Sequence, residues 1–190
     1  MVVAAALAGA VFAGLPRAAQ EPGQAPQDSG REAQEPGPAA RQPGAGAPEA
    51  GIVPADVRRR LAATDPVDAV RGLAQLRSLA LREGRLYLLD DVNAPNTPAQ
   101  AADRAIRVRL ERSGTVLAGF TASLSGVRRL PESTPARAVV AATSSATAYE
   151  ERAADGDTVA AGAPQQAVRL RLVLVPVEGR WRIADILPAA

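Results

Sequence analysis

The segments QQAVRLRLVLVPV (residues 165–177), EG (178–179) and RWRIADIL (180–187) form the most regular pattern in the sequence. Val168, Leu170, Leu172 and Leu174 alternate with arginines, which is the period of two of a half-buried strand. In the return segment, Trp181 and Ile183 alternate with Arg180 and Arg182 in the same way. The pattern predicts a β-hairpin that buries one face and exposes its arginines to water.

The composition removes several classes of chemistry. The chain has 190 residues and contains neither Cys nor His. Thiol nucleophiles, disulfides, the usual zinc ligands and the common proton carrier at neutral pH are therefore absent. We expect no cofactor and no metal site. All of the basic residues are Arg, and Ala is abundant, which suggests a bacterial genome of high G+C content.

The charge is divided unevenly along the chain. Residues 1–50 carry three arginines against five acidic residues, a net charge of −2, and residues 51–190 carry nineteen against fifteen, a net charge of +4. So small a surplus is weak support for nucleic-acid binding. We interpret the arginines of the terminal hairpin as a solvated sheet face, and nucleic acid as an improbable partner.

The N-terminus predicts an exported or membrane-tethered protein. Residues 1–16 form an apolar segment whose length suits a secretory signal better than a membrane span of about 20 residues. No basic residue precedes this segment, and the cleavage site after it is loose, so it could equally be the end of a longer membrane anchor. The alternative is a buried helix of a cytoplasmic protein.

The composition of residues 17–54 predicts a disordered linker. They are rich in Pro, Gly, Ala, Gln and Glu, and they contain almost no large apolar side chain before Ile52. Such a segment cannot bury enough surface to offset the entropy of ordering it. We expect a single folded domain over residues 55–190.

Helices should come first in this domain. After a short helical turn near Val57, Thr64-Asp65-Pro66 predicts the start of a helix over residues 66–83, and Gly84 suits its end. Residues 85–92 are predicted as a short helix, although a strand is possible. Thr97-Pro98 predicts a helix over 99–112, although the alternation after Ile106 would also suit a strand.

Strands should follow the helices. The sequence predicts one strand from Val116 toward Leu130 and a second over residues 137–151, separated by a loop at 131–135. A loop over residues 152–164 then leads to the terminal hairpin. The fold class is therefore α+β, with a curved four-stranded antiparallel sheet, a cone-like half-barrel, packed against about three N-terminal helices.

This element order, with the closing segment VEGRWRIAD (177–185), resembles the nuclear-transport-factor-two-like superfamily, which includes ketosteroid-isomerase-like and SnoaL-like proteins. The segment GRLYLLDDV (84–92) resembles its second helix. Within that superfamily the chain looks like the uncharacterised exported or tethered bacterial members. The resemblance implies a cone-shaped domain whose interior can hold a ligand.

Catalytic members of this superfamily place an Asp base and Tyr or acid donors inside the cone. The corresponding candidates here are Tyr87, Tyr149, Asp90, Asp91 and Asp185, and none of them pairs a nucleophile with a base. We expect Asp90 and Asp91 in solvent, Asp185 paired with an arginine, and Tyr87 in the core. The candidates for lining a ligand pocket are Tyr87, Phe120, Trp181 and Asp185.

The sequence thus favours a non-catalytic extracytoplasmic or membrane-tethered domain for binding or assembly. Its partner would be an unknown protein or a second copy that meets the exposed sheet, with the membrane reached through residues 1–16. The alternative is a small apolar-ligand pocket inside the cone, for binding or for isomerase- or dehydratase-type chemistry.

Overall fold

The computed structural model describes residues 52–189. The predicted anchor at 1–16 and the linker at 17–54, except its last three residues, lie outside this range. The described chain begins with the helices α1 (Ala55–Leu61) and α2 (Pro66–Arg82), the 3-10 helix η2 (Leu86–Asp91) and the helix α3 (Pro98–Ser113). All four were predicted as helical.

The helix boundaries follow from local hydrogen bonding. At the start of α2 the Asp65 side chain accepts a hydrogen bond from the Val67 amide, and at the start of α3 Thr97 accepts one from Gln100. Each cap precedes a proline, whose fixed backbone angle suits the first turn. Gly114 ends α3 with a left-handed conformation (φ 64°). The preference for a helix over a strand after Ile106 is confirmed.

Seven strands follow, and they form two antiparallel sheets. The small sheet has the order β1 (Thr115–Ala118), β4 (Tyr149–Ala153), β5 (Thr158–Gly162). The large sheet has the order β2 (Ala122–Arg129), β3 (Ala138–Ala146), β6 (Gln165–Val177), β7 (Arg180–Pro188). The prediction of a loop over 152–164 is wrong, because β4 and β5 form a hairpin there. The residues of β5 are mostly small and exposed, so they show no clear apolar alternation.

Three long strands bend along one line across the sheets, and we call this line the strand bend. β1 gives way to β2 at Gly119 (φ 82°), β3 to β4 at Thr147, and β5 to β6 at Ala163. The Thr147 hydroxyl donates to the Gly119 carbonyl (2.6 Å) and accepts from the Thr121 amide (2.9 Å). One side chain therefore replaces ladder hydrogen bonds that are interrupted at the bend.

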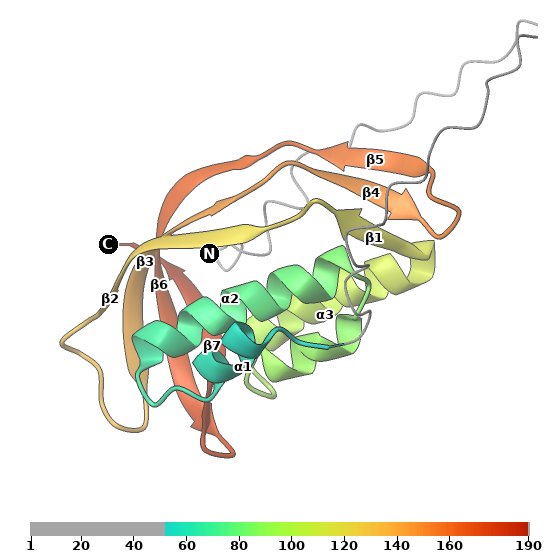
Figure 1. Cartoon of the computed structure of the whole chain (residues 1–190). Coiled ribbons are helices and arrows are strands. Elements are labelled where there is room, and N and C mark those ends of the chain that lie inside the picture. The colour runs from blue at the N-terminus through green and yellow to red at the C-terminus, as the bar shows by residue number, and fades with distance from the viewer. Residues whose placement is uncertain (1–51, 190) are drawn as a thin grey trace, which may run out of the picture. The chain divides into compact units, whose positions relative to one another are not determined.

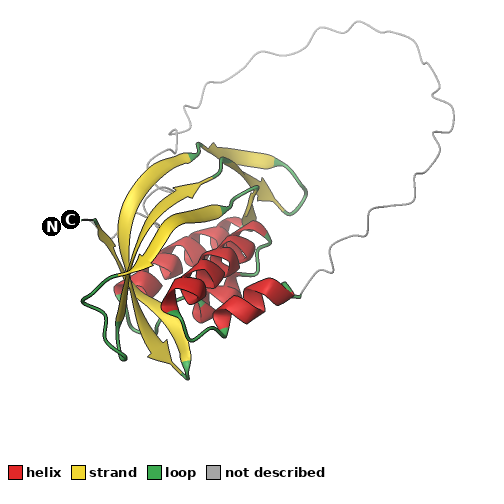
Figure 2. Cartoon of the chain, turned by 60° about the vertical axis from the view of Figure 1, so that its left-hand side comes forward, coloured by secondary structure: helices red, strands yellow, loops and turns green. Residues whose placement is uncertain are grey.

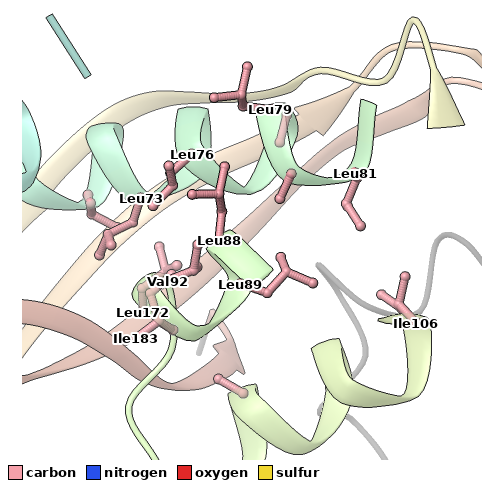
Figure 3. Close-up of a cluster of buried hydrophobic side chains, with 14 of the residues drawn as sticks. Leu73, Leu76, Leu79, Leu81, Leu88, Leu89, Val92, Ile106, Leu172 and Ile183 are labelled. Carbon is pink, nitrogen blue, oxygen red and sulfur yellow. The ribbon is translucent and has the colours of Figure 1, made fainter. Parts of the chain in front are cut away.

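The sheets curve around the helices, with α2 and α3 lying along the concave side and α1 packed outside α2 (Figures 1 and 2). Figure 3 shows the core between these layers, where leucines of α2 and η2 meet the inner face of the large sheet at Leu172 and Ile183. Leu170, Leu172 and Leu174 are each at most 1% exposed. The predicted α+β fold with a curved sheet covered by N-terminal helices is confirmed.

The terminal hairpin forms as predicted, but two of its side chains differ from expectation. A bulge at Ala184 shifts the register, so that Leu174 pairs with Ile183 while Val173 pairs with Asp185. Arg182 was expected in water but is buried, and its Nη2 donates to Asp91 Oδ1 (2.6 Å). Val168 was expected to be buried but is 39% exposed, because it lies near the start of β6, where residues 166–169 are all exposed.

The free edge of β7 is closed by the segment that follows η2. The Ile183 amide donates to the Val92 carbonyl (3.0 Å), and the Ala94 amide donates to the Ile183 carbonyl (2.8 Å). Pairing of this kind protects an edge strand from further strand addition.

Candidate binding cleft

The structure does not bring together the four residues predicted to line a pocket, since they lie in η2, at the strand bend and in β7. Tyr87 in η2 is 58% exposed, so the expectation of a core tyrosine is wrong, and its hydroxyl accepts a hydrogen bond from Arg85 (3.1 Å). Phe120 is buried at the strand bend and packs edge-on against Tyr149, with 6.0 Å between ring centroids. The two side chains therefore play different roles, one at the surface and one in the core.

Trp181 and Asp185 both lie in β7 and are half-buried. Trp181 packs against the core, and its indole Nε1 donates to the Thr64 carbonyl (2.8 Å), which ties the sheet to the α1–α2 connection. The Asp185 carboxylate accepts from the Ile186 amide (2.8 Å). Among the described residues it has no arginine partner, contrary to expectation.

Asp90 and Asp91 are exposed, as expected, but each also pairs with an arginine. Asp90 accepts from Arg107 (3.2 Å), and Asp91 accepts from Arg182. These pairs join η2 to α3 and to β7, so both carboxylates have a structural role.

The structure instead places a cleft between α1, α2 and the start of β2. Its volume is about 620 Å³, within the range of small-molecule sites. Arg59 and Arg60 reach it from α1, Asp68, Arg71 and Gln75 from α2, and residues 121–124 from the sheet. A second cleft of about 270 Å³ shares Gln75, Thr121 and Ala122 with the first. Neither cleft is lined by any of the four predicted pocket residues.

Charge distinguishes this cleft from an apolar pocket. Three arginines and one aspartate line it, for a net charge of +2. Asp68 pairs with Arg71 (3.1 Å). Within residues 52–189, Arg59 and Arg60 have no carboxylate partner. The cleft therefore presents two guanidinium groups to solvent without an internal counter-ion.

Two close packings fix the walls of the cleft. At Gly72 of α2 an added Cβ would lie 2.7 Å from the Cβ of Arg60, so only glycine allows α1 to approach α2 this closely. On the other wall the Ala122 amide donates to the Ser78 hydroxyl (2.9 Å), and this hydroxyl donates to the Ala74 carbonyl (2.9 Å). These contacts join α1, α2 and β2 into one rigid frame.

A second polar cluster joins α3 to the small sheet. Arg109 Nη1 donates to both carboxylate oxygens of Glu151 (2.8 and 2.6 Å), and Thr115 donates to Oε1 (2.7 Å). Burial of Glu151 favours its neutral form, but these hydrogen bonds outweigh burial and hold its pKa below the ordinary value. Burial also raises the pKa of the neighbouring Tyr149 hydroxyl, with Arg109 opposing this.

The part of the chain that the structure describes contains no group of three acidic side chains that could hold a metal ion. No helix between residues 52 and 189 has both the length and the apolar character that crossing a bilayer requires.

No family model matches the chain, and no curated protein matches it. Similar solved structures include the intermembrane-space region of the chloroplast protein ARC6, with 17% identity over 63% of this chain and 92% of that chain and a TM-score of 0.44. An uncharacterised protein of cystatin-like fold from Caulobacter vibrioides has 20% identity over 63% and 84% and a TM-score of 0.41. A candidate ketosteroid isomerase from Shewanella frigidimarina has 18% identity over 64% and 95% and a TM-score of 0.36. We assign no function from structures at these TM-scores.

The element order does bear on the predicted resemblance. Helices precede a curved antiparallel sheet, and the chain closes on the hairpin β6–β7. The fold that the resemblance to the nuclear-transport-factor-two-like superfamily implies, with helices before a curved antiparallel sheet, is therefore confirmed.

The basic cleft was not predicted from the sequence. Its signal was the triplet Arg58-Arg59-Arg60 in the last turn of α1, followed by Arg71 in α2. Basic residues near a helix C-terminus are common because they complement the helix dipole, so the triplet alone does not indicate a site. Only the crossing of α1 over α2 brings Arg59, Arg60 and Arg71 to one cleft.

Proposed function

We propose that this chain is a non-catalytic binding or assembly domain that is held outside the cytoplasm, either tethered to a membrane or secreted. The observation that carries the proposal is the packing of the cone. Its inner sheet face is filled at Leu170, Leu172 and Leu174, and the buried Phe120 packs against Tyr149. Acid and tyrosine donors need a shared dry pocket to polarise a substrate, and the candidates here lie apart.

The location rests on the N-terminal sequence. An apolar segment at 1–16 followed by a linker rich in Pro and Gly at 17–54 would hold a folded domain away from a membrane. Fractionation of cells that produce the full chain, with N-terminal sequencing of the product, tests this. We expect membrane or exported fractions. A cytoplasmic protein that retains Met1 to Leu15 would contradict the location.

The binding role has its own test. Sedimentation velocity of the purified full chain measures whether copies associate through the exposed sheet, and a neutral apolar dye such as Nile red measures whether the cone accepts an apolar ligand. We expect no saturable one-to-one dye binding, because the inner face of the sheet is filled. Saturable binding of the dye would favour the alternative, an apolar-ligand pocket, over the proposed function.

A further inference from the structure

The cleft between α1, α2 and β2 combines three properties that a ligand site needs. It has a volume of about 620 Å³, it carries a net charge of +2, and its walls are held by the contacts of Gly72 and Ser78. Its position between two helices and a strand separates it from the filled cone. The cleft is therefore a site in its own right.

The unpaired cations define what this cleft attracts. Arg59 and Arg60 are neighbours in α1, and neither has a carboxylate partner within residues 52–189. Arg71, on the opposite wall, is held by Asp68 at 3.1 Å. Guanidinium groups bind carboxylate and phosphate oxygens through strong, charge-assisted hydrogen bonds. A single oxyanion between Arg59 and Arg60 would supply the counter-charge that residues 52–189 do not.

One buried polar atom defines a second feature of the ligand. Oε1 of Gln75 is buried and has no hydrogen-bond partner among the described residues. Such an atom is costly to leave unpaired, and because Gln75 lines the cleft, a rotation of its amide would let this oxygen accept a hydrogen bond from a ligand. The hydroxyl groups of Thr121 and Ser123 line the same space. A ligand that carries a hydroxyl beside its oxyanion would pair with the arginines and with Gln75 at the same time.

From these observations we infer that the cleft binds a small hydroxylated oxyanion, with its phosphate or carboxylate group at Arg59 and Arg60 and a neighbouring hydroxyl donating to Gln75. The inference rests on the proposed function in that the domain binds this molecule and does not convert it. Phosphates and carboxylates both have the oxyanion that this site requires, and the experiment therefore compares one ligand of each class.

The test is a titration of the ¹⁵N-labelled full chain followed by NMR at constant ionic strength. The probes are glycerol 3-phosphate and glycerate, which carry alcohol hydroxyl groups, and methyl phosphate and acetate, which do not. We expect saturable shifts of the Arg59 and Arg60 side chains and of the amides of residues 121–124. Glycerol 3-phosphate or glycerate should bind more tightly than the matched anion without an alcohol hydroxyl, here called the bare anion. Whichever of glycerol 3-phosphate and glycerate binds more tightly shows whether the preferred oxyanion is a phosphate or a carboxylate.

Three variants localise the binding. The double variant Arg59→Gln/Arg60→Gln should weaken binding of the tighter probe by about tenfold or more, because charge-assisted hydrogen bonds are lost. Gln75→Leu should remove the advantage of the hydroxylated probe while leaving binding of the bare anion. Arg58→Gln is the matched control, since Arg58 is exposed in the same helix and does not line the cleft. Trp181 fluorescence during thermal unfolding checks that each variant is folded.

Several results would overturn the inference. These are shifts that do not saturate with any probe, equal binding of hydroxylated and bare anions, or an equal loss of affinity in the Arg58→Gln control. Conversion of glycerol 3-phosphate, visible by ³¹P NMR, would instead contradict the proposed non-catalytic function and leave the cleft in place. The two failures are therefore distinguishable.

Discussion

At the scale of single residues, Arg77 and Asp103 form an ion pair in which both partners are buried. Arg77 donates through Nε and Nη2 to Asp103 Oδ1 (2.9 and 2.7 Å), and Asn93 donates to Oδ2 (2.8 Å). All three side chains are at most 5% exposed. This network joins α2, α3 and the segment that closes the edge of β7. It stabilises one arrangement of the helices, since each partner depends on the others.

Removal of Asp103 should be strongly destabilising. The variant Asp103→Ala leaves the Arg77 charge buried without a counter-ion, and we expect a loss of roughly 3 to 5 kcal/mol in the free energy of unfolding. Urea denaturation of the full chain measures it. The double variant Arg77→Met/Asp103→Leu should recover much of this loss, because an apolar pair removes the unpaired charge.

The exposed pair of Asp68 and Arg71 supplies the control for this measurement. Asp68→Ala should change the free energy of unfolding by less than about 1 kcal/mol. A similar cost for Asp68→Ala and Asp103→Ala would show that burial of the Arg77 network has no special importance.

Glu151 should make the stability depend on pH. Its folded-state pKa lies below the ordinary value of 4.5, so its carboxylate contributes stability above that pH, and the contribution is lost as the pH falls through the folded-state pKa. Glu151→Gln should lower the free energy of unfolding at pH 7 by roughly 2 to 4 kcal/mol. Below pH 4.5 the difference from the wild type should shrink.

Denaturation of wild type and variant from pH 7 to pH 3 measures this effect. Glu111→Gln is a suitable control, because Glu111 is about half exposed and pairs with Arg107 within the same helix. If the difference between wild type and Glu151→Gln stays constant across this range, protonation of Glu151 is not the cause.

At the scale of secondary-structure elements, α1 depends on its contact with α2. It has only seven residues and buries one side chain, Val57, so it is too short to be stable alone. Its close approach to Gly72 therefore provides its main support. The cleft keeps its shape only while this contact holds.

Gly72→Ala should loosen α1. The added methyl group would lie 2.7 Å from the Cβ of Arg60, and overpacking of this kind costs about 1 to 3 kcal/mol. Trypsin should then cut faster after Arg58, Arg59 and Arg60, which mass spectrometry can follow. Gly126→Ala provides a comparison, since its methyl group would meet open space while its positive φ strains the backbone. That variant should lose stability without faster cleavage in α1.

The elements differ in how well the sequence predicts them. Cap residues and prolines gave the starts of α2 and α3, because the signals lie within one helical turn. The strand β5 escaped prediction because its residues are mostly small and exposed, so no apolar period marks them. The burial of Arg182 was also missed, since its partner Asp91 lies 91 residues away and sequence spacing cannot reveal such a contact.

At the scale of the whole molecule, the fold was predictable and the candidate site was not. The element order and the terminal hairpin determine a sheet covered by helices, because each apolar face must be buried. The cleft arises from the crossing of two helices beside a strand edge, and Gly72 read in isolation gives no sign of it. Residues that seemed suited to a pocket, such as Phe120, turned out to fill the core.

The strand bend has a consequence for how the domain opens. On one side of the strand bend the large sheet lies against a dense core, and on the other β5 has no buried residue. Local opening is easiest where few apolar contacts are lost. Amide hydrogens of residues 158–162 should thus be replaced by deuterium long before those of residues 170–174, with Ala163 marking where fast exchange gives way to slow.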